Sequence, residues 1–312
     1  MPHPNAMAIP RRVYVFLAVG LIAASQSGNL VRLGDAPAVV MAAWRLALAS
    51  AMLLMLARGK IQKLVSLSWA DRGLLLLAGL ALAAHLIAWI AAVQATTVAS
   101  AAIFFSINPV LTATAAHLFF GERLGARLFV SIALGLLGTA VIGWEHISLR
   151  SEHLGGDLLA LLCSAFFTLY FLLGKRLRRR LDTDVYAAGI YGVAGAAGFL
   201  AGAALGLPLV GFSAQTWLAF ALLALVPTLL GHTSFNYALR YLDAGRIATA
   251  TLVEPLLAGL VAFWAYSEPI TTSMAAGYAL IAASVLALAT DRAPRAIAAR
   301  PRAEKAKVSR PG

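Results

Sequence analysis

Two ionisable side chains lie deep inside long apolar stretches of the sequence. They are Arg45, in MAAWRLALAS, and Glu254, in TLVEPLLAGL. In hydrocarbon an ionised side chain costs about 2.5–3.5 kcal/mol on insertion scales, so each must be paired, neutralised or in contact with water. We expect Arg45 to face a lumen, where it could meet the carboxylate of a bound molecule or Glu254. The alternative is an arginine that extends its head group to the membrane interface.

Histidine and aromatic residues recur at helical spacing in two further stretches. His85 and Trp89 are four residues apart, as are His232 and Asn236, so each pair shares one face of a helix. An imidazole beside an aromatic ring offers apolar surface and a hydrogen bond, the mixture that small-molecule sites use. Taken singly, tryptophan is common at membrane interfaces and a lone histidine is usually a bonded core residue. Either histidine could also relay protons, because imidazole titrates near neutral pH.

Together these residues predict one polar and aromatic cavity. The predicted lining comprises Gln26, Asn29, Trp44, Arg45, His85, Trp89, Ser106, Asn108, Tyr170, Tyr191, His232, Asn236 and Glu254. We expect no catalytic residue, no metal ligand and no cofactor.

A proline motif occurs twice in the sequence. Residues 108–124 read NPVLTATAAHLFFGERL, and residues 254–270 read EPLLAGLVAFWAYSEPI. In each copy a glutamate follows thirteen residues after the proline, Glu122 in the first and Glu268 in the second. Two such patterns need a common cause.

Each proline leaves a backbone carbonyl without its helical donor. The carbonyls belong to Phe105 and Thr251, and in lipid each must find another partner or face a wet cavity. The prolines could fix static kinks. Their occurrence at corresponding positions favours hinges at Pro109 and Pro255.

The composition requires a membrane. Of the 312 residues 61% are hydrophobic and 12% are charged, against about 25% charged in soluble domains. A bilayer core needs about 20 helical residues per crossing, and the alternation of a membrane barrel is absent. The sequence therefore predicts an all-α polytopic membrane protein with ten transmembrane helices. The predicted spans are 13–31, 37–57, 71–93, 97–120, 124–144, 155–174, 184–206, 215–239, 244–266 and 272–290.

Most lysines and arginines fall in alternate loops, which sets the predicted topology. The net charge is +12, and one cluster, at 174–180, reads GKRLRRR. Because basic loops stay in the cytoplasm, we expect both termini there and no nucleic-acid partner. Residues 1–12 are the predicted cytoplasmic N-terminus, and residues 291–312 a disordered basic cytoplasmic tail.

The sequence contains one cysteine, Cys163, so a disulfide framework is excluded.

The two halves of the chain resemble each other in opposite orientation. At an offset of 146 residues, the first repeat, 13–144, aligns span for span with the second, 155–290, although His232 falls one residue out of register with His85. Each repeat holds five spans, an odd number, so the second enters the membrane from the other side. Loop charges agree, because VRLGDAP has one cation where its counterpart KRLRRRLDTD has five. Inverted five-helix repeats typify secondary transporters, whose site lies at the repeat interface near mid-membrane.

These features resemble the drug/metabolite transporter superfamily in its ten-span EamA form. The similarity rests on the two repeats, the proline in spans four and nine, the glutamate that closes each, and glycine-rich stretches with GLLG at 135–138 and GYALIAAS at 277–284. It covers about residues 13–290, and within the superfamily the chain looks similar to YddG-type amino-acid exporters. The resemblance implies export of aromatic and other neutral amino acids across a bacterial inner membrane by alternating access. Ser267 and Pro269 depart from the family pattern.

Other function classes fit the sequence less well. An intramembrane enzyme would need a nucleophile with a base, or a metal cluster, and neither GxSxG nor HExxH occurs. A channel would need rings of like groups, which a pseudosymmetric monomer supplies poorly. A sugar-nucleotide carrier would need several cations in the lumen. An exporter of multiple drugs or lipophilic cations stays open as the alternative. We expect a monomer whose partners are a small-molecule substrate and the lipid bilayer.

Overall fold

Ten helical spans build the molecule. The structure, a computed structural model, describes residues 9–57, 60, 62–143, 151–266 and 269–290. The described residues form helices and no strand, and ten helical segments are long and apolar enough to cross a membrane. This confirms the all-α polytopic membrane fold predicted from the sequence.

Six spans are unbroken and four are broken. The unbroken spans are α3 (Ala38–Leu56), α5 (Trp69–Ala95), α8 (Ala126–Gly143), α9 (Ser151–Leu177), α10 (Thr183–Ala204) and α15 (Thr272–Thr290). The broken spans are α1 and α2 (Arg11–Ser25, Ser27–Val31), α6 and α7 (Val98–Phe105, Asn108–Phe120), α11, η3 and α12 (Ala214–Leu223, Ala224–His232, Thr233–Ala238), and α13, η4 and α14 (Ala244–Ala250, Thr251–Val253, Glu254–Tyr266). A short helix, α4 (Gln62–Val65), lies between spans two and three. Gly121 ends α7 with a φ of 66°, a left-handed cap that glycine adopts without strain.

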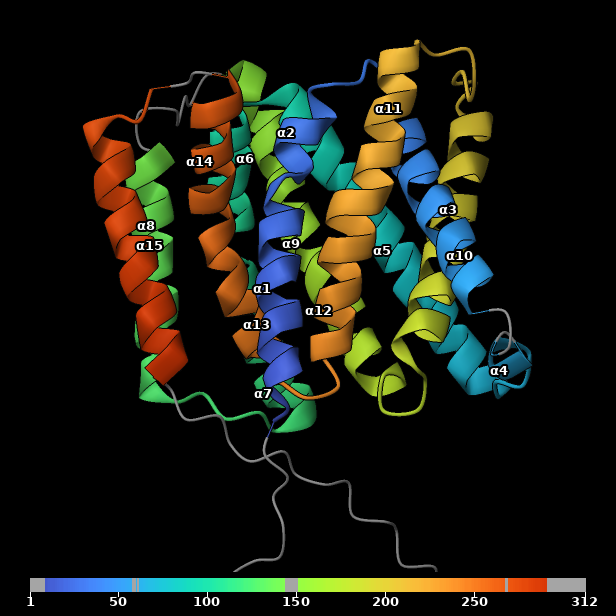
Figure 1. The fold of residues 1–312 in the computed structure, drawn as a ribbon, viewed down its shortest axis with the longest axis horizontal. Coiled ribbons are helices and arrows are strands. Elements are labelled where there is room, and N and C mark those ends of the chain that lie inside the picture. Colours follow the sequence, from blue (N-terminus) through green and yellow to red (C-terminus); the bar gives the residue numbers. More distant parts are fainter. Residues whose placement is uncertain (1–8, 58–59, 61, 144–150, 267–268, 291–312) are drawn as a thin grey trace, which may run out of the picture.

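The spans stand side by side in one upright bundle (Figure 1). At one end of its long axis α8 packs on α15, and at the other end α3 packs on α10. The first span begins and the last span ends at the same face, at the bottom of Figure 1. We call this the terminal face and its opposite the far face.

The packing of the spans follows the internal repeat. α5, which is span three, packs along α9, which is span six. In the same way α1, which is span one, packs along η3 and α12 of span eight. Spans one and eight are the counterparts of spans six and three in the other half. α3 packs on α10 and α8 on α15, each on its own counterpart. Small residues permit the close approach, because a Cβ on Gly198 would lie only 2.9 Å from the Cβ of Ala43. An approximate two-fold axis in the membrane plane produces this arrangement.

One pair of helices breaks the symmetry. At the terminal face α7 packs along α13, and a Cβ on Gly245 would lie 3.0 Å from Ala113. The corresponding helices towards the far face are α14 and α6, and both line a cavity rather than pack along each other. The bundle is therefore closed at the terminal face and hollow towards the far face.

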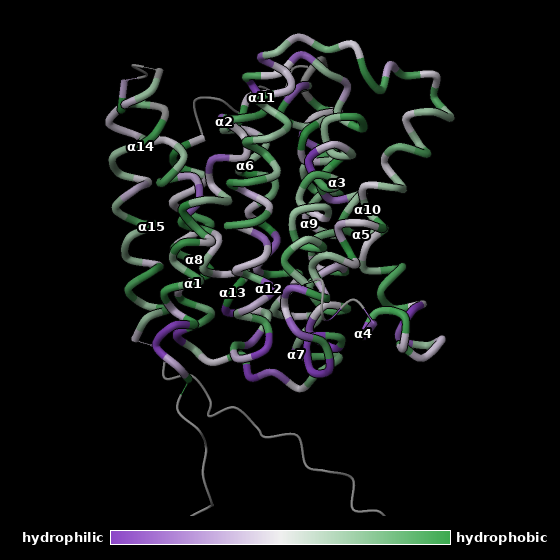
Figure 2. The backbone as a smooth tube through the Cα atoms, turned by 45° about the vertical axis from the view of Figure 1, so that its right-hand side comes forward, coloured by the Kyte–Doolittle hydropathy of each residue, from purple (hydrophilic) through white to green (hydrophobic). Residues whose placement is uncertain are grey.

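The surface of the bundle suits a membrane. Hydrophilic positions gather in the loops at the terminal face, and the helices above them are mostly hydrophobic (Figure 2). Large apolar side chains such as Phe129, Leu200 and Trp264 are exposed on the outside. Contact with lipid accounts for an apolar exterior that water would not support.

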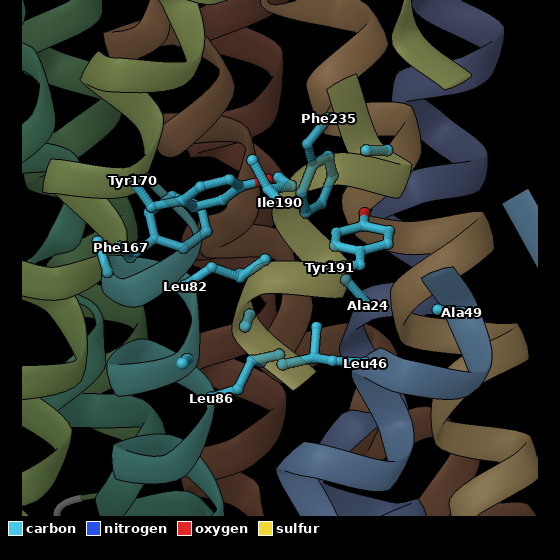
Figure 3. Close-up of a cluster of buried hydrophobic side chains, with 14 of the residues drawn as sticks. Ala24, Leu46, Ala49, Leu82, Leu86, Phe167, Tyr170, Ile190, Tyr191 and Phe235 are labelled. Carbon is cyan, nitrogen blue, oxygen red and sulfur yellow. The ribbon is translucent and has the colours of Figure 1, made fainter. Parts of the chain in front are cut away.

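Aromatic residues fill the core between α5, α9 and α10. Phe167 and Tyr170 lie on one side of Leu82, and Tyr191 lies on its other side, near Ala24 (Figure 3). Both tyrosines are fully buried, and the Tyr170 hydroxyl donates to Asn236 at 2.5 Å. The core is thus apolar in bulk, and the Tyr170 hydroxyl is paired within it.

The eighth span contains a π-helix, η3, around Pro227. Pro227 has no N–H to offer the carbonyl of Leu223, and the Thr228 hydroxyl donates to that carbonyl instead, at 2.8 Å. A π-turn holds one residue more than an α-turn. The extra residue accounts for the register difference in the repeat, because it brings His232 to the place that corresponds to His85.

We predict that Thr228→Val destabilises the protein. The Thr228 hydroxyl donates to Leu223 and accepts from Arg45 Nε at 2.7 Å, so its removal leaves the buried Nε of Arg45 without this partner. An unpaired buried group costs about 1–3 kcal/mol. The apparent melting temperature in detergent should fall by several degrees, whereas Thr290→Val, at an exposed site, should not change it. Equal melting temperatures for the two variants would contradict this account.

Candidate functional site

A cavity of about 470 Å³ lies between the two halves of the molecule. Helices α1, α2, α5, α6 and α8 of the first half line it together with η4, α14 and α15 of the second. The cavity reaches the far face, where Arg32 follows the end of α2 and Thr271 precedes the start of α15. Sites for small molecules typically measure about 300–1,000 Å³. The cavity therefore has the size of a metabolite site.

The cavity walls are mainly apolar and aromatic. Trp89, Phe105 and Tyr278 supply rings, and Trp89 packs edge to face on Phe105 with centroids 5.6 Å apart. Among the described lining residues, Glu254 is the acidic one and Arg32, at the mouth, is the basic one. The walls thus offer broad apolar contact and few charges.

A recess of about 40 Å³ adjoins the cavity, and we call it the inner recess. The two spaces share Trp89 and Glu254, and the recess adds Ser27, His85 and His232. The two imidazoles meet edge to face with centroids 5.7 Å apart. Because the histidines correspond in the repeat, the approximate two-fold axis passes between them. Within the described part of the chain, no three His, Cys, Asp or Glu side chains gather as a metal site requires.

The structure brings part of the predicted lining together. Asn29, Trp89, Ser106, Glu254 and the predicted hinge Pro255 line the cavity, and His85 and His232 line the inner recess. The remaining predicted residues lie elsewhere: Gln26, Trp44, Arg45, Asn108, Tyr170, Tyr191, Asn236 and the predicted hinge Pro109.

Arg45 lies behind the inner recess. Its fully buried side chain donates from Nε to the Thr228 hydroxyl at 2.7 Å and from Nη1 to the Ser27 hydroxyl at 2.9 Å. The third nitrogen, Nη2, has no partner among the described residues. Ser27 therefore lies between Arg45 and the recess, and the guanidinium is bound by Ser27 and Thr228 rather than by Glu254.

A chain of buried hydrogen bonds joins spans six, seven and eight below Arg45. The Tyr191 hydroxyl lies 3.0 Å from the Thr233 hydroxyl and accepts from Asn236 at 3.5 Å. Asn236 in turn accepts from Tyr170. Polar atoms without water need such partners, and these residues hold spans together instead of facing the cavity.

Trp44 and Asn108 also have partners away from the cavity. The Trp44 indole donates to the Leu209 carbonyl at 2.7 Å. Asn108 is fully buried, and its side-chain oxygen accepts from the Thr112 hydroxyl at 2.8 Å. Its counterpart in the second motif is Glu254, which lines the cavity. In this conformation the two proline motifs are thus placed differently, one against protein and one against the cavity.

Both carbonyls released by the prolines have found donors. Ser164 of α9 donates to the Phe105 carbonyl at 2.9 Å. The backbone N–H of Glu254 closes a 3₁₀ turn on the Thr251 carbonyl. Neither carbonyl therefore depends on water in the cavity.

Several lining residues carry little sequence signal. Ser27 and Phe105 are ordinary residues of a membrane helix, and Arg32 is marked only by its place one turn after Asn29. Tyr278 reaches the cavity beside Gly259, where a Cβ would lie 1.9 Å from the tyrosine hydroxyl. A glycine opposite a tyrosine on another span is a contact that one sequence does not reveal.

A polar cluster closes the terminal face. The Glu122 carboxylate accepts from the N–H groups of Ala244 and Gly245, at 3.1 and 3.3 Å, where α13 begins. Lys175, near the end of α9, donates to the same carboxylate and pairs with Asp243. A carboxylate at a helix N-terminus satisfies free N–H groups and interacts favourably with the helix dipole. We call these residues the terminal latch, which joins spans four, six and nine.

The corresponding glutamate of the second motif, Glu268, lies outside the described residues, as does Ser267.

Asp243 is the least favourable charge of the terminal latch. Burial, and then the neighbouring charge of Glu122, raise the pKa of the Asp243 carboxyl against the opposing effect of Lys175 and Arg246. Since the pKa is higher in the folded protein, ionisation of Asp243 lowers stability. That cost is absent below the unfolded-state pKa and complete above the raised folded-state pKa.

We predict that Asp243→Asn keeps or raises the apparent melting temperature at neutral pH and loses this advantage under acidic conditions. A lower melting temperature of the variant at neutral pH would contradict this prediction.

Comparison with known proteins agrees with this architecture. The model of the EamA-like transporter family matches residues 12–144 and 154–290. A protein of Archaeoglobus fulgidus described as an uncharacterized transporter is 29% identical over 201 residues, which cover 64% of this chain and 69% of that protein. A solved structure, described only as a crystal structure of a protein, shares the fold with a TM-score of 0.77 and 20% identity. That similarity covers 90% of this chain and 96% of the solved one.

We predict that Glu122→Ala opens the terminal face. The change removes the acceptor for two N–H groups of α13 and the partner of Lys175. A helix cap contributes about 0.5–2 kcal/mol, so the open population should rise about two- to thirtyfold. Hydrogen–deuterium exchange should rise by that factor along both α7 and α13, because exchange reports the population of open states.

The matched control for Glu122→Ala is Asp182→Asn. Asp182 pairs with Lys63 at 2.7 Å on the exposed surface, and exposed pairs contribute little. Exchange in α7 and α13 should be unchanged in this variant. Equal exchange in Glu122→Ala and the parent protein would show that the terminal latch does not hold the face closed.

Proposed function

The chain belongs to the EamA-like transporter family, and on that premise we propose that it exports small metabolites, chiefly aromatic and other neutral amino acids. Membership of that family makes it a multi-pass membrane transporter. The amino-acid substrate, the direction and the alternating-access mechanism are the proposal.

The proposal rests above all on a cavity that lies between two inverted halves and reaches the far face while the terminal face is closed. A carrier needs a central site that reaches one face at a time. The inner recess, with His85 and His232 beside the approximate two-fold axis, supports this role because it lies between the halves.

The chemistry of the walls favours an amino acid with an apolar side chain. Trp89, Phe105 and Tyr278 can pack on such a side chain, and aromatic pairs gain from edge-to-face contact. The Glu254 carboxylate can accept hydrogen bonds from an ammonium group. Phosphorylated substrates would need several cations, whereas Arg32 is the basic residue of the described lining.

The distribution of basic residues supports export from a bacterial cytoplasm. Arg11, Arg12 and the cluster GKRLRRR at 174–180 belong to the terminal face, which the positive-inside rule assigns to the cytoplasm of an inner membrane. The cavity then opens to the outside. We interpret the structure as the conformation from which an exported substrate leaves.

We propose that the two halves exchange their packing during transport. In the opposite conformation α14 packs along α6, and α7 separates from α13, since these are corresponding pairs. The terminal latch must then release α13. Pro109 and Pro255 lie where spans four and nine are already broken, which suits them as hinges.

An exporter of lipophilic cations is the second candidate. Glu254 among aromatic walls would suit a cation as well as an ammonium group. The two candidates differ in the need for a substrate carboxylate.

The decisive experiment uses purified protein in liposomes with a panel of labelled amino acids and a lipophilic cation, with and without a pH gradient. We expect flux of phenylalanine and other neutral amino acids. Flux of the cation without any amino-acid flux would favour the second candidate. Dependence on the pH gradient would establish proton coupling.

We predict that Trp89→Ala and Glu254→Gln lower amino-acid flux at least tenfold. Trp89 forms part of both the cavity and the inner recess, and Glu254 is the acidic residue of each. A lost hydrogen bond to a charged group costs about 1.5–3 kcal/mol, equivalent to roughly ten- to 150-fold in binding. Trp264→Ala, at a site 82% exposed, is the matched control and should transport normally. Normal flux in Trp89→Ala would contradict the assigned site.

We predict that Pro109→Ala and Pro255→Ala slow turnover more than they weaken substrate binding. Each change restores a helical donor and stiffens a broken span, whereas Pro109 itself is buried away from the cavity. Transport rates in liposomes and equilibrium binding separate the two effects. Unchanged turnover in both variants would rule out the hinges.

A further inference from the structure

Polar nitrogens without partners gather around the inner recess. His232 lines it with 6% of its surface exposed, and its Nδ1 has no partner among the described residues. The indole Nε1 of Trp89, which lines both the recess and the cavity, is likewise unpaired within the described chain. Buried polar groups in native proteins are nearly always hydrogen-bonded. The indole N–H is a donor, and the imidazole Nδ1 is a donor in one of its two tautomers, so these two groups point to a ligand that supplies acceptors.

Ser27 connects this recess to a buried positive charge. Arg45 Nη1 donates to the Ser27 oxygen at 2.9 Å, so the serine hydrogen is left to donate into the recess that Ser27 lines. Thr228 holds the guanidinium from its other side. A serine hydroxyl backed by an arginine suits an anion, because the charge strengthens the donated bond.

The acid lies at the junction of the two spaces. Glu254 lines both the inner recess and the cavity, whereas Arg45 lies behind Ser27. A molecule that places a negative group in the recess can therefore place a positive group at Glu254. Its remaining atoms would extend into the aromatic cavity beside Trp89 and Phe105.

We propose that the inner recess is a carboxylate subsite. Ser27 and His232 donate to the carboxylate, and Arg45 balances its charge from behind. A cavity of about 10–15 Å³ holds one water, so a recess of about 40 Å³ is of the right size for a carboxylate group. The ammonium group of the substrate meets Glu254. This assignment rests on the proposed amino-acid function and names the part of the ligand that the recess selects.

The position of the recess suits a carrier. His85 and His232 correspond in the repeat and lie on either side of the approximate two-fold axis. Groups beside that axis stay at the centre when the two halves exchange their packing. One carboxylate subsite can thus serve both conformations.

The test measures binding of labelled L-phenylalanine to the purified protein in nanodiscs, with L-phenylalaninamide as competitor. The amide keeps the ammonium group and the ring but lacks the carboxylate. We expect wild-type protein to prefer L-phenylalanine about tenfold, the value of one hydrogen bond to a charged group. Ser27→Ala and His232→Phe should each reduce this preference to about twofold or less by weakening binding of L-phenylalanine and leaving that of the amide unchanged.

Ser66→Ala is the matched serine control, because Ser66 is exposed and its hydroxyl donates to the nearby Lys63 carbonyl. It should keep the full preference. Binding of L-phenylalanine without preference over the amide, or an unchanged preference in both recess variants, would overturn the carboxylate subsite and leave the amino-acid function standing. Failure of every amino acid to bind the wild type would overturn that function and the subsite together.

Discussion

In the interior of a membrane every backbone polar group must find its partner within the protein, and the arrangement of the spans depends on this constraint. Where Pro109 removes a donor, Ser164 of another span bonds the Phe105 carbonyl. Where Pro227 does so, the Thr228 hydroxyl bonds Leu223 and at the same time holds Arg45. Each break is thereby tied to a neighbouring span or to its own side chain. The irregular backbone that a carrier needs at its centre is stable for this reason.

The same constraint underlies our proposal that two similar halves pack in two ways. At the terminal face the start of α13 exposes N–H groups, and Glu122 of the other half accepts them, with Lys175 balancing its charge. The corresponding helices towards the far face, α6 and α14, line a cavity instead. One set of pairings is made while the other is open. The cavity lies where α6 and α14 do not pack along each other, and in our proposal the two pairs of helices exchange these arrangements.

Much of the fold follows from the sequence, because long apolar runs predict the ten spans and loop charges predict their inversion. The cavity is harder to predict. Helical spacing puts His85 and Trp89 on one face, and the structure indeed places both at the recess or cavity. For Tyr170, Tyr191 and Asn236 the spacing predicts the helix face on which each side chain lies, but it does not predict which neighbouring span packs on that face. In the structure these three side chains bond one another between spans six, seven and eight. Ser27 is too common a residue to attract notice. The offset of His232 has its cause in a π-helix that only the backbone reveals.

The central claim is that the two faces open in alternation, and paired spin-label distances test it most directly. One pair of labels would report α6 against α14 at the far face, and another would report α7 against α13 at the terminal face, in a Cys163→Ser protein during turnover with phenylalanine. The account predicts reciprocal change, in which the far-face distance shortens within the same population whose terminal-face distance lengthens. A population with both distances long, or a far-face closure that leaves the terminal-face distance unchanged, would contradict it.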